Sequence, residues 1–492
     1  MLGFWRSHAD FQQLTATELS FIARSNPYAL LEYEAPISKL FILDLDLLKP
    51  LIAPHYSAIG RPSINQPEIF RSLLLMNDLG FSLDKWIVKL SLNRVLQIAC
   101  GFFSGRLPGV ASYYDFLNRI VKLEEKPRVK PKKRKPKKKY GKQKMPHKRQ
   151  GIVQKLVDRI LKGRRFDNRP ERLLQEIFAK VCVQPSIDLG LVPHTVSISG
   201  DGTCIKTGAS PYGRKTCECA DFFCDCPRRF SDPNATWGWD SHNERYFYGY
   251  TGYLISTYNR TEKLDLPLYL RLVDAKRHDS ISAVVALSEF RDLYPNLTVD
   301  TFISDSASDN YATYQLLNEW GINAVIALNK TNKGNRKFPS CVVNPNGVPV
   351  CPAGHEMIRA GFCGKDRCRI KWRCPRVLGK CMIAKACLDC SDSAYGRVVY
   401  TKPSWDLRLF SRIPRGSEQW KSKMKERTAA ERVNNRILHH YGLENSKMRG
   451  KKRISFLATI AAFNVHLDAQ LAKLKAIGLF DFNSTFGVQL AA

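Results

Sequence analysis

The sequence predicts an α/β protein with a mixed β-sheet flanked by helices, a helical N-terminal region and a cysteine-rich insertion. Three features lead to this prediction. Apolar residues recur at helical steps before residue 120, strand and helix patterns alternate between 194 and 329, and residues 330–415 lose both patterns while gaining Cys, Gly and Pro. The 492 residues suffice for several domains, and 44% hydrophobic with 25% charged residues is a globular composition.

The N-terminal region, residues 1–125, has the periodicity of amphipathic helices. In the segment IFRSLLLMNDLGFSLDKWIVKLSLNRVLQIACGF, which starts at Ile69, apolar residues recur at three- and four-residue steps. Gly80 and Gly101 interrupt this pattern. We therefore expect several short helices around a small core.

A basic, proline-rich linker, residues 126–150, follows. Of its 24 residues from Lys126 to Arg149, 14 are Lys or Arg and none is acidic, and four prolines prevent a regular helix. The whole chain has 77 basic against 45 acidic residues, a net charge of +32. Such an excess repels itself, so we expect a nucleic acid partner, with an acidic membrane surface as the alternative. The linker residues predicted to contact DNA are Lys132, Lys133, Arg134 and Lys135.

The sequence gives no indication of a membrane protein. Its longest apolar stretch, from Ile454 to Phe463, is interrupted by Ser455 and Thr459 and is shorter than the roughly 20 residues that span a bilayer. The N-terminus has no signal-peptide pattern. We expect a cytoplasmic protein without a membrane partner.

Residues 151–329 alternate between helical and strand patterns. Helical stretches near 152–163 and 170–183 come first, and HTVSISGDGT (194–203) then predicts a strand ending in a turn. Three strands, and then helix, strand, helix and strand, are the order of a mixed α/β sheet. The remaining predicted strands are 244–260, 266–279, 297–305 and 322–329, and the predicted helices are 280–294, with Ser280 as its N-cap, and 310–321.

After the Cys-rich insertion, residues 330–415, the helical pattern returns in residues 416–492. It covers 418–442 and approximately 453–474. These helices are expected to complete the α/β domain.

Three acidic residues stand where such a sheet would bring them together. Asp201 follows the first predicted strand, Asp305 ends the fourth, and Glu431 lies on the helix after the insertion. Side chains at strand ends open into the crevice where α/β proteins bind ligands. Clustered carboxylates repel one another, and hard cations such as Mg²⁺ or Mn²⁺ relieve this by taking oxygen ligands. Two such ions clamp the attacking and leaving oxygens of a phosphoryl displacement.

Asp309 is the alternative to Asp305 as the second carboxylate. We prefer Asp305 because it directly follows the strand, whereas Asp309 is placed to cap the next helix. Arg427 and Glu431 are also spaced as an i,i+4 ion pair, which would be a weak surface contact.

The motifs GDGT, ISDSASD and Arg427-x3-Glu431, in this order, resemble the DDE transposases of bacterial and archaeal insertion sequences. The resemblance covers most of the chain. Residues 69–120 are similar to the N-terminal domain of these enzymes, and RHDS (277–280) resembles a His-Asp-Ser element before their first helix. Residues 330–415 occupy the place of the insertion that the family carries before the Glu helix.

This resemblance implies an RNase H-like catalytic domain with Asp201, Asp305 and Glu431 as its metal ligands. It also implies a prokaryotic, nucleoid-associated transposase that binds the terminal inverted repeats of its element as a homo-oligomer. With two Mg²⁺ or Mn²⁺ ions, such an enzyme cleaves the DNA and transfers the 3′-hydroxyl strand to target DNA. The alternatives are a nuclease of the same fold without strand transfer, and a zinc-bearing DNA-binding protein whose carboxylate site is silent.

One part of the family pattern is missing. Part of the superfamily has the signature Tyr-x2-Arg-x3-Glu-x6-Lys. In this sequence, Met424 occupies the Tyr position and Leu438 occupies the Lys position. We expect Arg427, Arg432 and Arg436 to supply DNA contacts on this helix.

The cysteines form two groups. CECADFFCDC has Cys217, Cys219, Cys224 and Cys226 within ten residues, enough thiolates to close around one structural Zn²⁺. A second group runs through the insertion, where Cys387 and Cys390 form a C-x2-C pair. Reduced, metal-free thiols are the alternative for both groups. The candidate zinc ligands of the second group are Cys351, Cys374, Cys387 and Cys390.

The segment WGWDSHNERYFYGY (237–250) is dense in aromatic residues. Core packing explains Tyr246 to Tyr250. Trp237 and Trp239 lie outside the predicted strand, and stacking on an unpaired base is the alternative to a structural role for them.

Overall fold

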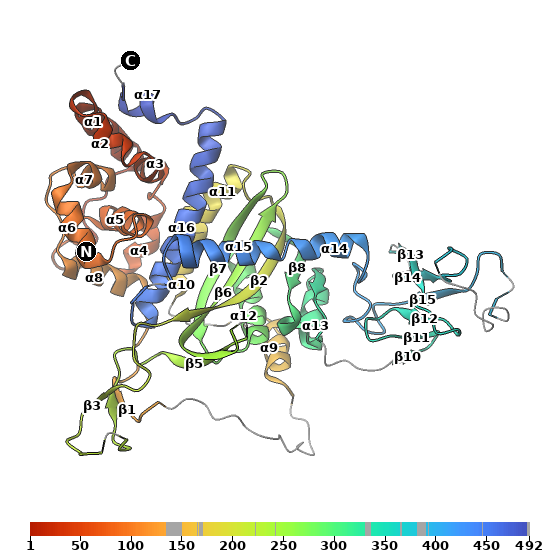
Figure 1. Ribbon diagram of the computed structural model, residues 1–492. Coiled ribbons are helices and arrows are strands. Elements are labelled where there is room, and N and C mark those ends of the chain that lie inside the picture. Colours follow the sequence, from red (N-terminus) through yellow and green to blue (C-terminus); the bar gives the residue numbers. More distant parts are fainter. Residues whose placement is uncertain are drawn as a thin grey trace.

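A mixed β-sheet forms the centre of the molecule in the computed structural model (Figure 1). In the central strand, β2 (Thr195–Lys206), one edge pairs antiparallel with β6 (Arg245–Asn259) and the other pairs parallel with β8 (Thr298–Ser304). β9 (Asn323–Ile326) runs parallel to β8, and both β7 (Leu264–Asp274) and β5 (Thr236–Asp240) pair antiparallel with β6. The structure describes residues 1–133, 150–164, 166, 171–221, 223–241, 243–329, 336–364, 367–380, 390–391, 393–444 and 446–489.

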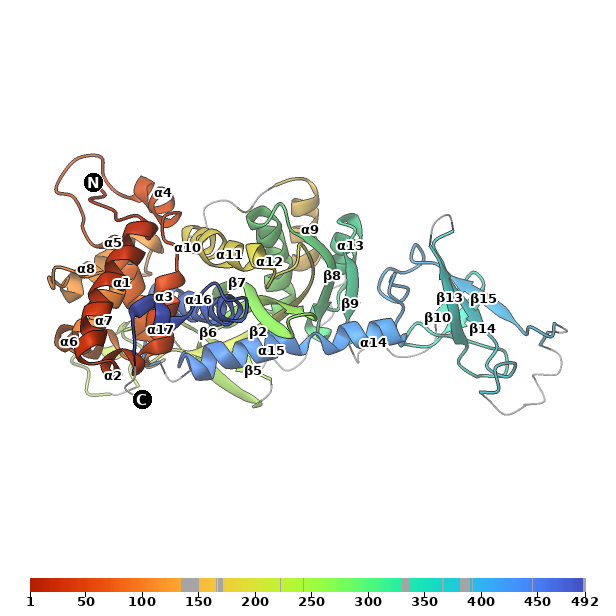
Figure 2. The same cartoon turned by 90° about the horizontal axis from the view of Figure 1, so that it is seen from above.

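Helices cover both faces of this sheet, which confirms the predicted mixed sheet flanked by helices (Figure 2). α12 (Asp279–Leu293) packs against β2, β6 and β7, and α9 (Ile152–Leu161) packs on α12 and on α13 (Tyr311–Glu319). On the opposite face, α15 (Thr428–Asn435) crosses β2, β6 and β7, while α14 (Glu418–Lys425) contacts β8 and β9.

The helices before residue 125 share one continuous hydrophobic core with the sheet. Two further helices, α10 (Arg172–Ile177) and α11 (Gln184–Asp188), flank a π-helical stretch over Phe178–Val183 and belong to the same core. The N-terminal helices are α1 (His8–Ser25), α2 (Tyr28–Leu31), α3 (Glu34–Ile42), α4 (Leu48–Ile52), α5 (Gln66–Asp78), α6 (Leu83–Leu92), α7 (Arg94–Cys100) and α8 (Val110–Ile120).

The long helix α16 (Lys451–Ala476) lies between the N-terminal helices and the sheet. Its most apolar part is long enough to cross a membrane, but 94% of that window is buried inside the molecule. Asn464 Nδ2 donates to the Leu74 carbonyl of α5 at 3.2 Å. A short helix, α17 (Phe482–Phe486), follows and packs on α1.

The insertion has a small core of its own and extends from the end of the sheet that carries β9 and α13 (Figures 1 and 2). Its two three-stranded antiparallel sheets enclose Trp372 and Phe410. The first consists of β10 (Arg336–Phe338), β11 (Cys341–Val343) and β12 (Pro349–Val350), and the second of β13 (Ile358–Cys363), β14 (Arg369–Arg373) and β15 (Val398–Thr401).

Another small sheet protrudes below the central sheet in Figure 1. β3 (Arg214–Lys215) and β4 (Arg228–Arg229) form a hairpin, and β1 (Val129–Lys130) pairs with the outer edge of β4. The beginning of the basic linker is therefore a strand of this sheet.

Several predicted element boundaries are wrong. The strand predicted to end before Asp201 continues as β2 to Lys206, because β6 pairs with it along that whole length. Trp237 and Trp239 lie within a strand, β5, rather than outside one. The N-cap of α12 is His278, whose Nδ1 accepts from the Ser280 amide at 3.2 Å, and not Ser280. The helix predicted over 418–442 is broken between α14 and α15 and ends in a π-helical turn, Arg436–His440.

Candidate active site and metal centre

The pairing of β2 with β8 brings Asp201 and Asp305 to the same level of the sheet. Ser199 is paired with Ile303, and each Asp stands two residues further along its chain. Because adjacent strands lie about 4.8 Å apart and side chains alternate with a period of two, both carboxylates lie on one face of the sheet, at the edge where β8 ends. β8 ends at Ser304, and the Asp305 side chain accepts from the Ala307 amide at 2.9 Å.

Glu431 approaches this edge from α15, the helix that crosses the sheet. From the same helix, Asn434 Nδ2 donates to Asp201 Oδ2 at 3.2 Å, which fixes α15 against β2. Arg427 Nη2 lies 2.6 Å from Glu431 Oε1, so the predicted i,i+4 pair is formed. The Glu431 side chain is 48% exposed and remains accessible to a ligand.

A fourth carboxylate, Asp279, was not among the predicted site residues. It begins α12 on the opposite face of the sheet, and its carboxylate lies directly over Gly202. A Cβ at position 202 would collide with the Asp279 carboxylate, so the second glycine of GDGT leaves the space that this side chain occupies. The RHDS motif contained this residue, but no periodicity in the sequence indicated which strand it would meet.

Two of the four carboxyl groups, Asp201 and Asp279, have raised pKa values. Burial, with Asp279, Asp305 and Glu431 as nearby negative charges, raises the pKa of Asp201 to about 6, while Arg427 acts in the opposite direction. Burial and the charge of Asp305 raise the pKa of Asp279 to about 6. A bound cation would reverse these shifts because it stabilises the ionised carboxylates.

The carboxylates are nevertheless not close enough together to form a compact set of metal ligands. Among the residues that the structure describes, only the four cysteines of CECADFFCDC place three or more ligand atoms all within 4.8 Å of one another. The acidic residues do not form such a group, but the charges of Asp279, Asp305 and Glu431 still act on Asp201. Their donor set, carboxylate oxygens only, suits a hard cation such as Mg²⁺ or Mn²⁺.

Asp309, the alternative to Asp305, has a different role. Its side chain is fully buried and ion-paired with Arg408 of the insertion, whose Nε donates to Asp309 Oδ1 at 2.6 Å. The expected capping role is wrong, since Asn310 caps α13 by accepting from the Thr313 amide at 3.0 Å. This placement favours Asp305 as the carboxylate facing the site.

The two positions that depart from the transposase signature are used for packing. Met424 packs against Ile303 and Val325 under α14. Leu438 packs against the main core.

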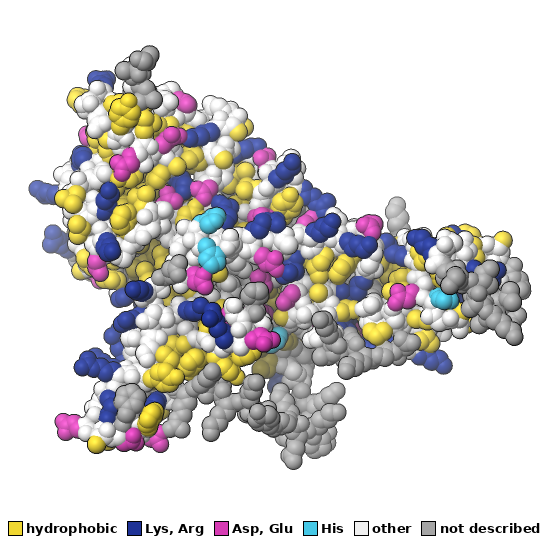
Figure 3. Space-filling model, in the orientation of Figure 1, with side chains coloured by type: hydrophobic (Ala, Val, Ile, Leu, Met, Phe, Trp, Pro, Cys, Tyr) yellow, Lys and Arg dark blue, Asp and Glu magenta, His cyan; other side chains and the backbone are white. Residues whose placement is uncertain are grey.

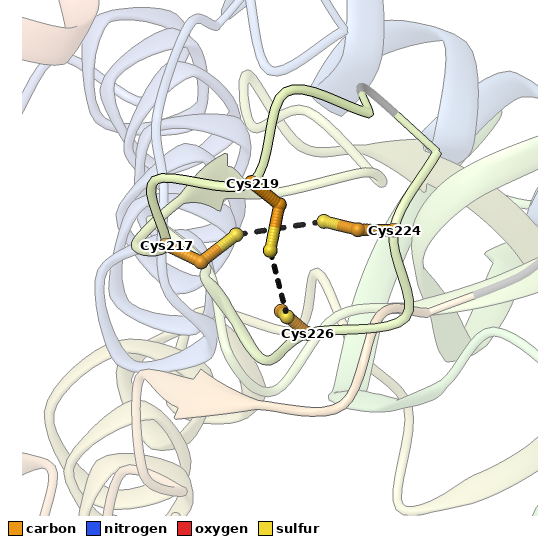
Figure 4. Close-up of side chains that lie close together, drawn as sticks. All are labelled: Cys217, Cys219, Cys224 and Cys226. Atoms are coloured by element: carbon orange, nitrogen blue, oxygen red, sulfur yellow. Dashed lines mark hydrogen bonds between the residues drawn. The ribbon is translucent and has the colours of Figure 1, made fainter.

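The first cysteine group is assembled in the loop between β3 and β4 (Figure 4). The Cys217 and Cys224 sulfurs lie 3.5 Å apart, and those of Cys219 and Cys226 lie 3.6 Å apart. A disulfide needs about 2.05 Å, so these are not disulfides. Four sulfurs this close can hold a metal such as zinc.

The second cysteine group is not assembled in the described residues. Cys351 is 8% exposed and packs in the core of the insertion, while Cys374 and Cys390 are partly buried. Cys387 lies outside the described residues. Zinc in the insertion stays a prediction.

The basic residues predicted to bind DNA have different surroundings. Arg432 is bound to Asp265 through two hydrogen bonds, with Nη2 to Oδ1 at 2.8 Å, and Arg436 Nη2 lies 3.2 Å from Asp468 Oδ2. Lys133 Nζ donates inward, to the Ala235 carbonyl at 2.6 Å. Lys132 is partly buried, and Arg134 and Lys135 lie outside the described residues.

The small sheet adds two exposed arginines that the sequence analysis did not single out. Arg214 and Arg229 are directly opposite each other on β3 and β4. Like charges in this position destabilise a sheet, which a bound polyanion would offset. In Figure 3, Lys and Arg side chains lie along this part of the molecule and acidic side chains lie at its tip.

The aromatic strand β5 is partly accessible. Trp239 is 49% exposed and lies edge-on to Tyr246, with ring centroids 4.9 Å apart. Trp237 is partly buried against Tyr248, at 5.6 Å. Trp239 is thus the better placed of the two for stacking on a base.

Comparison of the chain with models of known protein families and with curated proteins finds no match.

Proposed function

We propose that this protein is a DDE transposase with an RNase H-like catalytic domain. The observation that supports this most is the convergence of Asp201, Asp305 and Glu431 on one edge of a mixed sheet, where burial and the charges of Asp305 and Glu431 raise the pKa of Asp201. These are the strand, strand and helix positions that the resemblance to DDE transposases implies. Asp279 joins them from the other face of the sheet.

Asp201, Asp305 and Glu431 would hold Mg²⁺ or Mn²⁺, with Asp279 as a further carboxylate beside them. When bound, two such ions supply Lewis-acid stabilisation of the attacking and leaving oxygens of a phosphodiester. Asn434 orients the Asp201 carboxylate through its hydrogen bond. Arg427 orients Glu431 and partly compensates the negative charge of the site.

The DNA substrate would be recognised over a wider basic surface. The exposed arginines Arg214 and Arg229 and the basic linker supply phosphate contacts, which position DNA without reading its sequence. We propose that the terminal inverted repeats and target DNA are bound by a homo-oligomer, and that Trp239 stacks on an unpaired base near the cleaved end.

A supercoiled plasmid carrying the element ends tests this function. With Mg²⁺, the wild-type protein should nick the ends and join them to target DNA. Asp201→Asn, Asp305→Asn and Glu431→Gln should each lower cleavage by at least about 10³-fold while leaving DNA binding intact, because only the carboxylate charge is removed.

Asp300→Asn is the matched control, because it makes the same change on β8 at a side chain that faces Lys423 at 3.8 Å rather than the site. It should cleave at nearly the wild-type rate. Nicking without joining would favour a nuclease, and binding without nicking would favour a silent DNA-binding protein. Cleavage near the wild-type rate by any of the three carboxylate variants would remove that residue from the site.

A further inference from the structure

The loop between β3 and β4 contains a second candidate metal site, distinct from the carboxylates. Cys217 lies two residues after the end of β3, and Cys226 lies two residues before the start of β4. Cys219 and Cys224 are placed symmetrically inside the loop. All four sulfurs therefore project from the same closed end of one hairpin (Figure 4).

The sulfur separations agree with a tetrahedral zinc site. With Zn–S bonds of about 2.3 Å, the edges of a regular tetrahedron are about 3.8 Å long. The two measured pairs lie at 3.5 and 3.6 Å, and all four sulfurs lie within 4.8 Å of one another. Arg228 Nη2 lies 3.7 Å from the Cys224 sulfur, so a positive charge stands beside the thiolates.

The hairpin needs an additional constraint to be stable. Each strand has two residues, and the pairs across it, Arg214 with Arg229 and Lys215 with Arg228, have like charges. Two-residue strands with opposed like charges give little stabilisation to offset the entropy of closing the loop between them. A metal bound to four thiolates from both ends of this loop would supply it.

The same hairpin holds the beginning of the basic linker. β1 pairs with β4, with Val129 opposite Arg229 and Lys130 opposite Arg228. The Phe230 amide donates to the Arg128 carbonyl at 2.9 Å. Lys133 then donates to the Tyr248 hydroxyl at 2.7 Å, with Nζ 5.1 Å from the centre of the Phe230 ring.

We propose that Cys217, Cys219, Cys224 and Cys226 bind one Zn²⁺, and that the zinc-closed hairpin anchors the start of the basic linker to the body of the protein. Without the ion, β4 loses the constraint that holds it in place, and β1 loses its pairing partner. Zinc binding itself does not depend on the proposed catalytic activity.

Zinc content of the purified full-length protein, measured by elemental analysis, is the first test. Cys224→Ser with Cys226→Ser should remove about one Zn²⁺ per chain, on the four-ligand count of one structural site. Cys363→Ser with Cys368→Ser is the matched control, because it removes two exposed thiols of the insertion, and it should leave this ion in place. An unchanged zinc content in the first variant, or protein without zinc, would overturn the proposal.

Hydrogen exchange tests the anchoring role. In the Cys224→Ser, Cys226→Ser variant, the amides of Lys130 and Phe230 should exchange at least about tenfold faster, while those of β2 and β6 should keep their protection. Unchanged protection of β1 would refute the anchor. Should the variant fail to fold, wild-type protein prepared with Co²⁺ replaces it, and absence of the absorption of tetrahedral Co²⁺–thiolate would refute the site.

Discussion

The cysteine loop and the carboxylate edge assemble their groups in opposite ways. The four thiols come from ten consecutive residues and lie within 4.8 Å of one another. The carboxylates come from β2, α12, the end of β8 and α15, and they depend on the whole fold to meet. Residues close in sequence bring the thiols together locally, whereas the carboxylates repel one another and are positioned only by the packing of distant elements.

The largest expected effects concern the carboxylate edge, where Asp305 is assigned to the site and Asp309 to a structural ion pair. Asp309→Ala should lower the free energy of unfolding by about 3–5 kcal/mol, because it removes one partner of a buried ion pair with Arg408. Asp305→Ala should cost only about 1 kcal/mol, from the lost cap, and should abolish cleavage. Denaturant unfolding together with a cleavage assay would measure both. If Asp309→Ala proved harmless to stability but inactive, the two roles would have to be exchanged.

Asp201 should lower the stability of the folded protein at neutral and higher pH when no cation is bound. Its pKa of about 6 in the folded protein lies above the ordinary 3.8. The folded state therefore binds more protons in that window, and stability is lost as the pH rises through it. Asp201→Asn should be more stable than wild type by up to about 3 kcal/mol at pH 8 without metal, and equal to it near pH 4. Thermal unfolding with and without Mg²⁺ checks this, because Mg²⁺ should stabilise the wild type alone.

His466 should make stability change with pH in the opposite direction to Asp201. It is buried with Nδ1 2.8 Å from the Ser186 hydroxyl, and burial lowers the pKa of its ring to about 4. The unfolded state binds the proton first, so stability should fall by up to about 1.4 kcal/mol per pH unit from pH 6.5 down to 4. In His466→Gln this slope should disappear. A slope equal to that of the wild type would place the acid sensitivity elsewhere.

The smallest effects should distinguish Arg432, which is paired with Asp265, from the exposed residues Arg214 and Arg229. Arg214→Ala with Arg229→Ala should reduce the slope of log K against log salt for DNA binding by about 2, because each phosphate contact contributes about 0.9. Arg432→Ala is the comparison, since that side chain is already bound to Asp265. Its slope should equal that of the wild type, measured by fluorescence anisotropy. A reduced slope would restore Arg432 as a DNA contact.

Sequence reasoning predicted features that depend on local spacing. The mixed sheet flanked by helices followed from the order of strand and helix patterns, and the close packing of the four thiols followed from their spacing. It missed β5, whose pairing with β6 depends on a turn between two aromatic segments. It also missed the approach of Asp279 to Gly202 and the pairing of Asp309 with Arg408, because contacts 77 and 99 residues apart in sequence leave no local periodicity.

The central position of α16 has a consequence for how the chain folds during its synthesis. The hydrogen bond from Asn464 to the Leu74 carbonyl joins residues 390 apart in sequence, and α16 packs on α5 as well as on β7. The apolar surfaces of the N-terminal helices therefore remain uncovered until most of the chain has been synthesised. Contacts of such high sequence separation slow folding and leave the nascent chain exposed to aggregation and chaperone binding.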